Sequence, residues 1–381
     1  MKFLHVADLH IGKIVNDFSM LEDQKFILEQ IKNLIAEHKA EGLIIAGDVY
    51  DRAIPPAEAV TVFDSFLTEL AQRGVSVFLI SGNHDSPERI SFGETLLGRT
   101  GIYIAGTLKE ELRVIRIPQD YGEIQIVLLP FVKPAQVGGK TTREAVEKLL
   151  ADYREKEKSL EEKKTRRILV THYFVTDGGK EPELSDSETT VHVGGLDNVD
   201  ASAFEGFDYV ALGHIHKPQQ IGTYPIWYSG APLKYSFGET GQTKSAILFS
   251  VEEEGVRDVT PIPLCPLREM RKLTGTLQQL MEDKQMREAY GNDYIQAILT
   301  DEGELIDPIG CLRSAYPNVM QIVRQETLRT SEERGKESAG KKILAEKKDT
   351  LSLFQAFYLE VRGEEMGEEK QRILTELIKE A

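Results

Sequence analysis

The chain has 381 residues, of which 41% are hydrophobic and 28% are charged, and its formal net charge at pH 7 is −16. The length predicts two or more domains, the composition is typical of a globular protein, and no apolar stretch approaches the ~20 residues of a membrane-spanning helix. The negative charge argues against binding nucleic acid through basic side chains alone. It does not exclude a nucleic-acid substrate, because bound cations can reverse the sign of a site locally.

The N-terminus and the cysteines bear on the cellular compartment. The first apolar run is interrupted by His5, Asp8 and His10, so it does not resemble the core of a signal peptide. The two cysteines, Cys265 and Cys311, are too few for a disulfide framework. We therefore expect a cytoplasmic protein whose thiols are reduced and structural.

Short apolar runs alternate with helical patterns through the first part of the chain. Strands are predicted at 3–8, 42–48 and 75–82, and amphipathic helices at 21–40 and 55–74. Strand–helix–strand units of this length predict a partly parallel sheet that is covered on both faces.

Further strands and one charged helix complete the first domain, which we expect to end near residue 255. The charges of the helix are most simply a solvated face; a basic patch for a polyanion is the less favoured alternative. Strands are predicted at 102–106, 124–131, 167–174, 208–216 and 245–251, and the charged helix at about 143–167.

A small α+β domain without histidine is predicted for residues 256–325. Its expected strands and helices are 269–275, 276–290, 294–303, 307–317 and 319–325, with a capping-box spacing at Thr276 and Gln279.

The C-terminal part differs from both domains. Residues 326–350 are charged and poor in apolar residues, which predicts a linker, and residues 351–381 carry two short amphipathic helical stripes. These helices either fold back onto the body or dock on another chain; we favour docking, helix against helix. The residues expected to make that contact are Leu351, Phe354, Phe357, Tyr358, Leu374 and Leu377.

Polar side chains with ligand or proton-transfer chemistry follow five of the predicted strands. Because the carboxyl ends of neighbouring strands meet in one crevice, we expect these distant clusters to gather. They are Asp8 and His10; Asp48 and Asp51; Asn83, His84 and Asp85; His172; and His214 and His216.

Each cluster is weak by itself, since a lone histidine on an apolar strand is more often a core residue than a ligand. The joint pattern favours a site, because five of the eight histidines fall in these clusters. His5 faces the other way by strand alternation and is expected to be structural, and neither His38 nor His192 is assigned a role.

The chemistry of the set predicts two metal ions. By strand alternation, the two-residue spacings Asp8/His10 and His214/His216 point both members to the same side, and the Asp48 carboxylate can bridge cations about 3.5–4 Å apart. Two divalent ions outweigh the ligand charge, so the site suits a phosphate ester. Mixed imidazole and oxygen ligands favour Mn²⁺, Fe²⁺ or Zn²⁺ over Mg²⁺.

His84 is not needed as a ligand if Asn83 binds metal. Its imidazolium could donate a proton to a leaving alkoxide or stabilise transition-state charge. Asp85 beside it could set the tautomer or basicity of His84.

The order D-x-H, G-D-x-x-D, G-N-H-D, H and G-H-x-H resembles the calcineurin-like metallophosphoesterases over roughly residues 1–255. The stretches GDVYDRAIPP, GNHDSPERI and GHIHKPQQIGTYPIWYSGAPLKYSFGE are similar to the bacterial branch of the Mre nuclease family. The resemblance implies an α/β metallophosphoesterase fold, with two mixed β-sheets packed together and flanked by helices. It also implies a capping domain at 256–325 and docking helices at 351–381.

The same resemblance implies a manganese-dependent DNA nuclease, cutting duplex ends 3′→5′ and hairpins or single strands internally, in DNA repair and recombination. It implies a homodimer within a heterotetramer, with an SbcC-type coiled-coil ATPase as partner. His84 matches the catalytic histidine of the family. One metal would be held by Asp8, His10, Asp48 and His216, and the other by Asp48, Asn83, His172 and His214.

Three other functions are compatible with parts of the pattern. A phosphoprotein phosphatase would share Asp51-Arg52, but usually has arginine before and glutamate after the G-N-H motif, where this chain has Ser81 and Asp85. A cyclic-nucleotide phosphodiesterase would leave the C-terminal extension unexplained. A non-catalytic scaffold would not need the complete ligand set.

Overall fold

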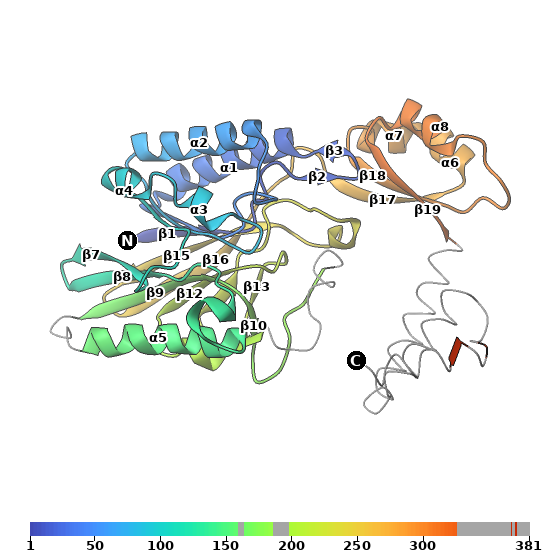
Figure 1. Ribbon diagram of the computed structural model, residues 1–381. Coiled ribbons are helices and arrows are strands. Elements are labelled where there is room, and N and C mark those ends of the chain that lie inside the picture. Colours follow the sequence, from blue (N-terminus) through green and yellow to red (C-terminus); the bar gives the residue numbers. More distant parts are fainter. Residues whose placement is uncertain (159–163, 186–197, 326–366, 368–369, 372–381) are drawn as a thin grey trace.

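The computed structural model contains two folded domains, the larger N-terminal and the smaller C-terminal (Figure 1). No helix in the described part of the chain is long and apolar enough to cross a membrane. The structure describes residues 1–158, 164–185, 198–325, 367 and 370–371.

The first sheet of the larger domain has the strand order β16-β15-β1-β4-β5-β6. Four neighbouring strands are parallel, and β15 and β16 are antiparallel to their neighbours. The bounds are β1 Lys2–Val6, β4 Gly42–Ala46, β5 Ser76–Ile80, β6 Ile102–Ala105, β15 Ser245–Glu252 and β16 Gly255–Pro263.

The second sheet has the order β13-β14-β12-β9-β8-β7. Its four central strands are parallel and its two edge strands are antiparallel. The bounds are β7 Arg113–Gln119, β8 Gly122–Leu128, β9 Thr165–His172, β12 Tyr209–Gly213, β13 Gln219–Gln220 and β14 Ile226–Tyr228.

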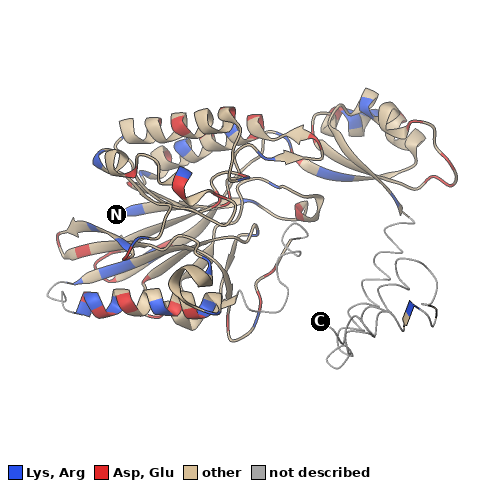
Figure 2. Ribbon diagram, viewed as in Figure 1, with Lys and Arg blue, Asp and Glu red and all other residues tan. Residues whose placement is uncertain are grey.

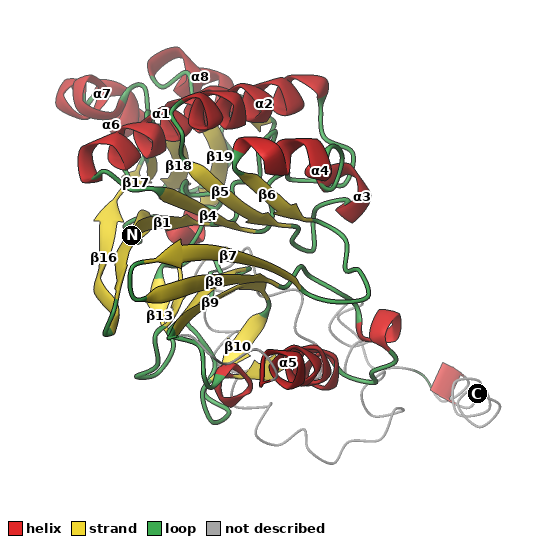
Figure 3. Cartoon of the chain, turned by 90° about the vertical axis from the view of Figure 1, so that its left-hand side faces the viewer, coloured by secondary structure: helices red, strands yellow, loops and turns green. Residues whose placement is uncertain are grey.

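The two sheets pack face to face around buried aromatic rings. The ring of Phe249 stacks on that of Tyr209, from the opposite sheet, at 4.0 Å between centroids, and on Phe3 at 5.4 Å. Helices α1 (Leu21–His38) and α2 (Ala57–Gln72) cover the outer face of the first sheet, and α5 (Thr142–Lys158) covers that of the second (Figure 3). The predicted architecture of two mixed sheets flanked by helices is confirmed.

Helix α5 is shorter than the sequence predicts. Its described residues are Thr142–Lys158 and β9 begins at Thr165, whereas the charged pattern predicted a helix to residue 167. Arg167 lies in β9 because its segment pairs in register with both β8 and β12. Acidic and basic residues are interleaved along α5 (Figure 2), which agrees with a solvated face.

The smaller domain has a parallel sheet, β17-β18-β19, covered by short helices. The helix predicted over 276–290 is divided in two, because Asp283 is extended and its carboxylate accepts a hydrogen bond from the amide of Met286. The predicted capping box at Thr276 and Gln279 is present. The bounds are β17 Met270–Gly275, α6 Leu277–Glu282, α7 Lys284–Tyr290, β18 Tyr294–Leu299, α8 Pro308–Ala315 and β19 Val319–Arg324.

Strand β16 (Gly255–Pro263) extends beyond residue 255, where the sequence predicts that the first domain ends. Strand β16 pairs with β15 over Gly255–Pro263, so it completes the first sheet. The segments predicted as a linker at 326–350 and docking helices at 351–381 lie outside the described residues, apart from three isolated positions.

The remaining elements are short and lie mostly in connections. They are β2 Ile14–Val15, β3 Phe18–Ser19, α3 Pro87–Ile90, α4 Glu94–Leu97, β10 Phe174–Thr176 and β11 Asn198–Asp200, with 3₁₀ turns at Gly98–Thr100, Pro134–Val137, Ala201–Phe204 and Phe237–Glu239.

Candidate metal centre

The five predicted polar clusters lie at the carboxyl ends of strands from both sheets, and their side chains meet. β1, β4 and β5 of the first sheet and β9 and β12 of the second end immediately before, or in, these clusters. The two packed sheets therefore bring together residues more than 200 positions apart in the chain, such as His10 and His216.

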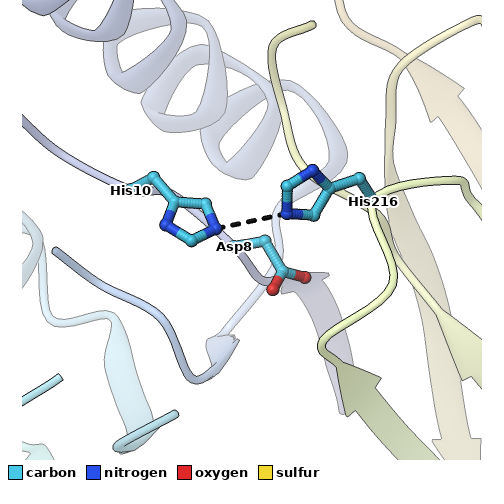
Figure 4. A group of neighbouring side chains, drawn as sticks. All are labelled: Asp8, His10 and His216. Carbon is cyan, nitrogen blue, oxygen red and sulfur yellow. Dashed lines mark hydrogen bonds between the residues drawn. The ribbon is translucent and has the colours of Figure 1, made fainter. Parts of the chain in front are cut away.

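One group of side chains consists of Asp8, His10 and His216. Their ligand atoms lie within 4.8 Å of one another, and all three residues are buried. The Nε2 atoms of His10 and His216 are 3.2 Å apart and face each other above the Asp8 carboxylate (Figure 4). Two imidazoles and a carboxylate converging in this way are a typical half of a transition-metal coordination sphere.

A second group converges on the Asn83 side-chain oxygen. That oxygen is 3.1 Å from Nε2 of His172 and 3.0 Å from Nδ1 of His214. Nδ1 of His172 donates to the carbonyl of Ala46 at 2.7 Å, which leaves Nε2 directed at the group. One amide oxygen and two imidazole nitrogens therefore lie close enough together to be ligands of the same metal ion.

Asp48 lies between the two groups. Its Oδ2 atom is 3.3 Å from Nε2 of His172 and 3.8 Å from Nε2 of His10. Its other oxygen accepts a hydrogen bond from the amide of His84 at 2.9 Å. One carboxylate therefore contacts both groups, which is the arrangement expected of a ligand shared by two cations.

The backbone of the site is in strained, left-handed conformations. Asp8 has a φ of 53°, His10 of 45°, Asp48 of 50° and His214 of 100°. Each such non-glycine residue costs about 1–3 kcal/mol and persists only where its surroundings hold it. The strand-alternation argument for Asp8/His10 and His214/His216 is therefore wrong: β1 ends at Val6, and these side chains are aimed by loop conformation.

Two glycines beside Asp48 permit the close approach of the loops. Gly47 has a φ of 87°, which favours glycine, and a Cβ there would lie 2.5 Å from Nδ1 of His172. A Cβ on Gly82 would overlap the Asp48 carboxylate. The glycines of the G-D and G-N motifs are therefore steric requirements of the site.

Burial and attraction between charged groups together set the pKa values of the site. Burial raises the pKa of Asp8 to about 7 and lowers the pKa of His10 well below its ordinary value. For the Asp48–His172 pair burial opposes both charges, but mutual attraction lowers the pKa of Asp48 and raises that of His172 to about 9. Buried carboxylates and imidazoles at such short distances fit bound divalent cations, which stabilise the anionic and the neutral forms respectively.

His84 lies at the exposed edge of the site. Its ring is edge-on to His10, 4.9 Å between centroids, and its Nδ1 is 3.0 Å from the carbonyl oxygen of Asp51. The Asp51 carboxylate forms an ion pair with Lys13 at 2.6 Å and lies 3.8 Å from Nδ1 of His10.

The role predicted for Asp85 is not supported. Its carboxylate accepts hydrogen bonds from the amides of Val49, Tyr50 and Gly82 at 3.0–3.1 Å, and the contact of His84 is instead with Asp51. Asp85 is buried and joins the turns that follow β4 and β5. It therefore stabilises the backbone that carries Asp48 and Asn83.

The sequence patterns missed Glu239 and Lys244, which lie behind His216. The Glu239 carboxylate is fully buried, 3.6 Å from Nδ1 of His216 and 2.6 Å from the Lys244 ammonium. Burial raises its pKa, but His216 and Lys244 outweigh this and lower the pKa to about 2. Carboxylates that orient metal-binding histidines are common, yet a single glutamate at the end of a short 3₁₀ turn gives no distinguishing signal in the sequence.

Comparison with known proteins is consistent with this geometry. Residues 1–218 match the calcineurin-like phosphoesterase family, and residues 266–362 match the SbcD_C family, described as the type 5 capsule protein repressor C-terminal domain. The SbcD subunit of the nuclease SbcCD from Staphylococcus epidermidis is 32% identical over 326 residues, covering 84% of this chain and 85% of that protein.

Two solved structures are also similar. A dimetal phosphatase from Danio rerio is 12% identical, with 69% of this chain and 99% of that chain covered and a TM-score of 0.41. GAP50, the anchor in the inner membrane complex of Plasmodium, is 11% identical, with 85% and 96% covered and a TM-score of 0.43. At these scores the assignment depends on the family matches.

The fold, the site and a match over more than half of the chain define a calcineurin-like phosphoesterase, a class of enzymes that use divalent metal ions. Two further findings narrow the assignment within this class: residues 266–362 match the SbcD_C family, and the chain is 32% identical to the staphylococcal protein. The chain belongs to the SbcD family of nuclease subunits.

Proposed function

We propose that this chain is the nuclease subunit of an SbcCD-type complex and hydrolyses DNA phosphodiesters at the site described above. The observation that carries the proposal is the Asp48 carboxylate, which contacts two ligand groups at once. The 32% identity to a nuclease subunit supports DNA as the substrate.

Seven side chains would hold two divalent cations. Mixed nitrogen and oxygen ligands without thiolate favour Mn²⁺, Fe²⁺ or Zn²⁺ over Mg²⁺, and we choose Mn²⁺ among these because the resemblance to the Mre nuclease family implies it. When bound, the cations supply Lewis acidity and neutralise phosphate charge. One would be held by Asp8, His10, Asp48 and His216, and the other by Asp48, Asn83, His172 and His214.

His84 is the group of this chain that we assign to proton transfer. The carbonyl oxygen of Asp51 can only accept a hydrogen bond, so Nδ1 of His84 carries a proton when the two are bonded. A second proton on Nε2 makes the ring an imidazolium. From the exposed edge of the site this proton can pass to the departing oxygen of a phosphodiester, or stabilise its negative charge.

We divide the chain into four regions and assign the last of them to partner binding. We propose a nuclease domain over 1–263, a capping domain over 264–325, a linker over 326–350 and docking helices over 351–381. The helices would contact the coiled coil of an SbcC-type ATPase, in a heterotetramer built on a dimer of this chain. The SbcD_C match over residues 266–362 supports the capping domain and the first docking helix. We propose that the complex acts in the cytoplasm, in DNA repair and recombination.

The substrate class can be tested with one panel. Purified protein, chelated and then supplied with Mn²⁺, should cleave hairpin and duplex DNA and leave a phosphoprotein and a cyclic nucleotide intact. Cleavage should be absent before Mn²⁺ is added. Preference for the phosphoprotein, or full activity in metal-free buffer, would overturn the proposal.

The partner assignment has a separate test. Deleting residues 351–381 should leave Mn²⁺-dependent cleavage of hairpin DNA intact and abolish co-purification with the ATPase. Retained co-purification would refute the docking role of the terminal helices.

A further inference from the structure

Gln24, in the first turn of α1, directs its polar atoms at the loop that carries His10. The residue is 3% exposed. Its Nε2 donates to the carbonyl oxygen of His10 at 2.7 Å and lies 3.3 Å from that of Leu9, and its Oε1 accepts from the amide of Gly12 at 2.9 Å. A single side chain thus bonds to the loop on both sides of His10.

Tyr235 completes this contact from a distant part of the chain. Its hydroxyl donates to the carbonyl of Leu9 at 2.5 Å and lies 3.1 Å from Nε2 of Gln24. Its ring is edge-on to the imidazole of His10 at 5.6 Å. Because His10 has a left-handed backbone, its conformation depends on such external contacts.

The neighbouring residue, Asp23, connects the same helical turn to the smaller domain. Its carboxylate is fully buried, and Oδ2 accepts hydrogen bonds from Arg268 at 2.6 Å and from the Tyr294 hydroxyl at 2.7 Å. Tyr294 belongs to β18 and also packs against Phe18, 6.1 Å between ring centroids. Through these two hydrogen bonds, the buried carboxylate of Asp23 links the smaller domain to helix α1.

We propose that the first turn of α1 is a positioning element for the metal centre. Gln24 holds the His10 loop in its strained conformation, and Asp23 ties that turn to the smaller domain. The affinity of the Asp8–His10–His216 group for metal then depends on how the smaller domain packs against α1. This inference rests on the proposed metal centre.

The test of Gln24 is the variant Gln24→Leu, which keeps similar volume and removes every bond to the loop. Mn²⁺ affinity measured by calorimetry should fall about 10–100-fold, the usual effect of losing a residue that orients a ligand. Turnover of hairpin DNA at low Mn²⁺ should fall with it, while KM for DNA stays within about twofold. Tyr235→Phe, which keeps the ring, should shift affinity in the same direction and provides a second variant if Gln24→Leu does not fold.

Lys32 is the control, a buried polar residue of the same helix. Its ammonium pairs with Glu29 and with Glu69 of α2, both at 2.5 Å, and makes no described contact with the loop at 9–12 or with the smaller domain. Lys32→Met should bind Mn²⁺ as the unmodified protein does. Equal losses for Gln24→Leu and Lys32→Met would show only a general role in holding the helix, and would overturn the positioning role.

The tie to the smaller domain is tested with Tyr294→Phe, which removes one bond to Asp23. It should weaken Mn²⁺ binding severalfold in the unmodified protein and have no further effect in the Gln24→Leu background. Additive effects of the two substitutions would refute the coupling. If the unmodified protein binds no Mn²⁺, the proposed function fails; if it binds and folded Gln24→Leu binds equally well, only the inference fails.

Discussion

The two domains use polar residues at strand ends for different purposes. In the smaller domain Thr276 follows β17 and Asp301 follows β18, and both accept hydrogen bonds from amides that begin α6, at 3.2 and 2.8 Å. In the larger domain the corresponding residues, Asp8 and Asp48, lie among imidazoles. A polar residue after a parallel strand therefore does not indicate a metal site by itself. The groups that surround it in the folded protein determine whether it can bind metal.

Asp85 shows that both uses occur within one motif. It follows β5 beside Asn83 and His84, yet it bonds to three amides as Asp301 bonds to one. Some strand-end residues are therefore potential metal ligands, whereas others bond to backbone amides and stabilise turns. Substitutions at the two kinds of residue should have different effects.

The largest effect is expected for Asp48→Ala. Because the carboxylate contacts both ligand groups, its removal should cost several kcal/mol of charge stabilisation and on the order of 10⁴-fold in DNA hydrolysis with Mn²⁺. Asp301→Ala is the matched control and should leave turnover unchanged. Comparable losses for both acids would remove the distinction between the domains.

His84→Gln should lower kcat by about 10²–10⁴-fold, because the amide cannot donate a proton to the leaving oxygen. Mn²⁺ binding measured by calorimetry should stay close to that of the unmodified protein. A variant with unchanged turnover would exclude His84 from the reaction, and one that loses metal would make it a ligand.

Glu239→Gln should weaken Mn²⁺ binding about 10–100-fold through the orientation of His216. The substitution keeps the shape of the side chain and removes the charge that faces Lys244 and Nδ1 of His216. Unchanged affinity in a titration would mean that Glu239 only neutralises Lys244.

Asp85→Ala should act mainly on stability. It leaves three amides without their carboxylate partner, which we expect to lower the free energy of unfolding by about 3 kcal/mol in a denaturant titration. The pH profile of kcat should keep its shape below the melting temperature. A shifted profile would restore the role in His84 basicity that the sequence suggested.

The sequence alone determined the secondary structure of both domains and the chemical types of the seven candidate ligands. Strand ends and glycine turns are local features, so the strand ends beside Asn83 and His172 could be predicted from nearby residues, whereas their candidacy as ligands depended on the joint pattern of motifs along the chain. Helix ends were less certain, as the early end of α5 and the break at Asp283 show, because long-range strand pairing and a local side-chain cap decide them.

Only the tertiary structure decided how those ligands are held. The left-handed backbone of Asp8 and His10, the carboxylate of Glu239 behind His216 and the contact of Gln24 with the His10 loop join residues from separate elements. No periodicity in the sequence encodes such contacts, because each depends on the packing of two sheets and a helix. For the same reason, the sequence does not show which amides bond to Asp85, because the turns after β4 and β5 lie side by side only in the folded chain.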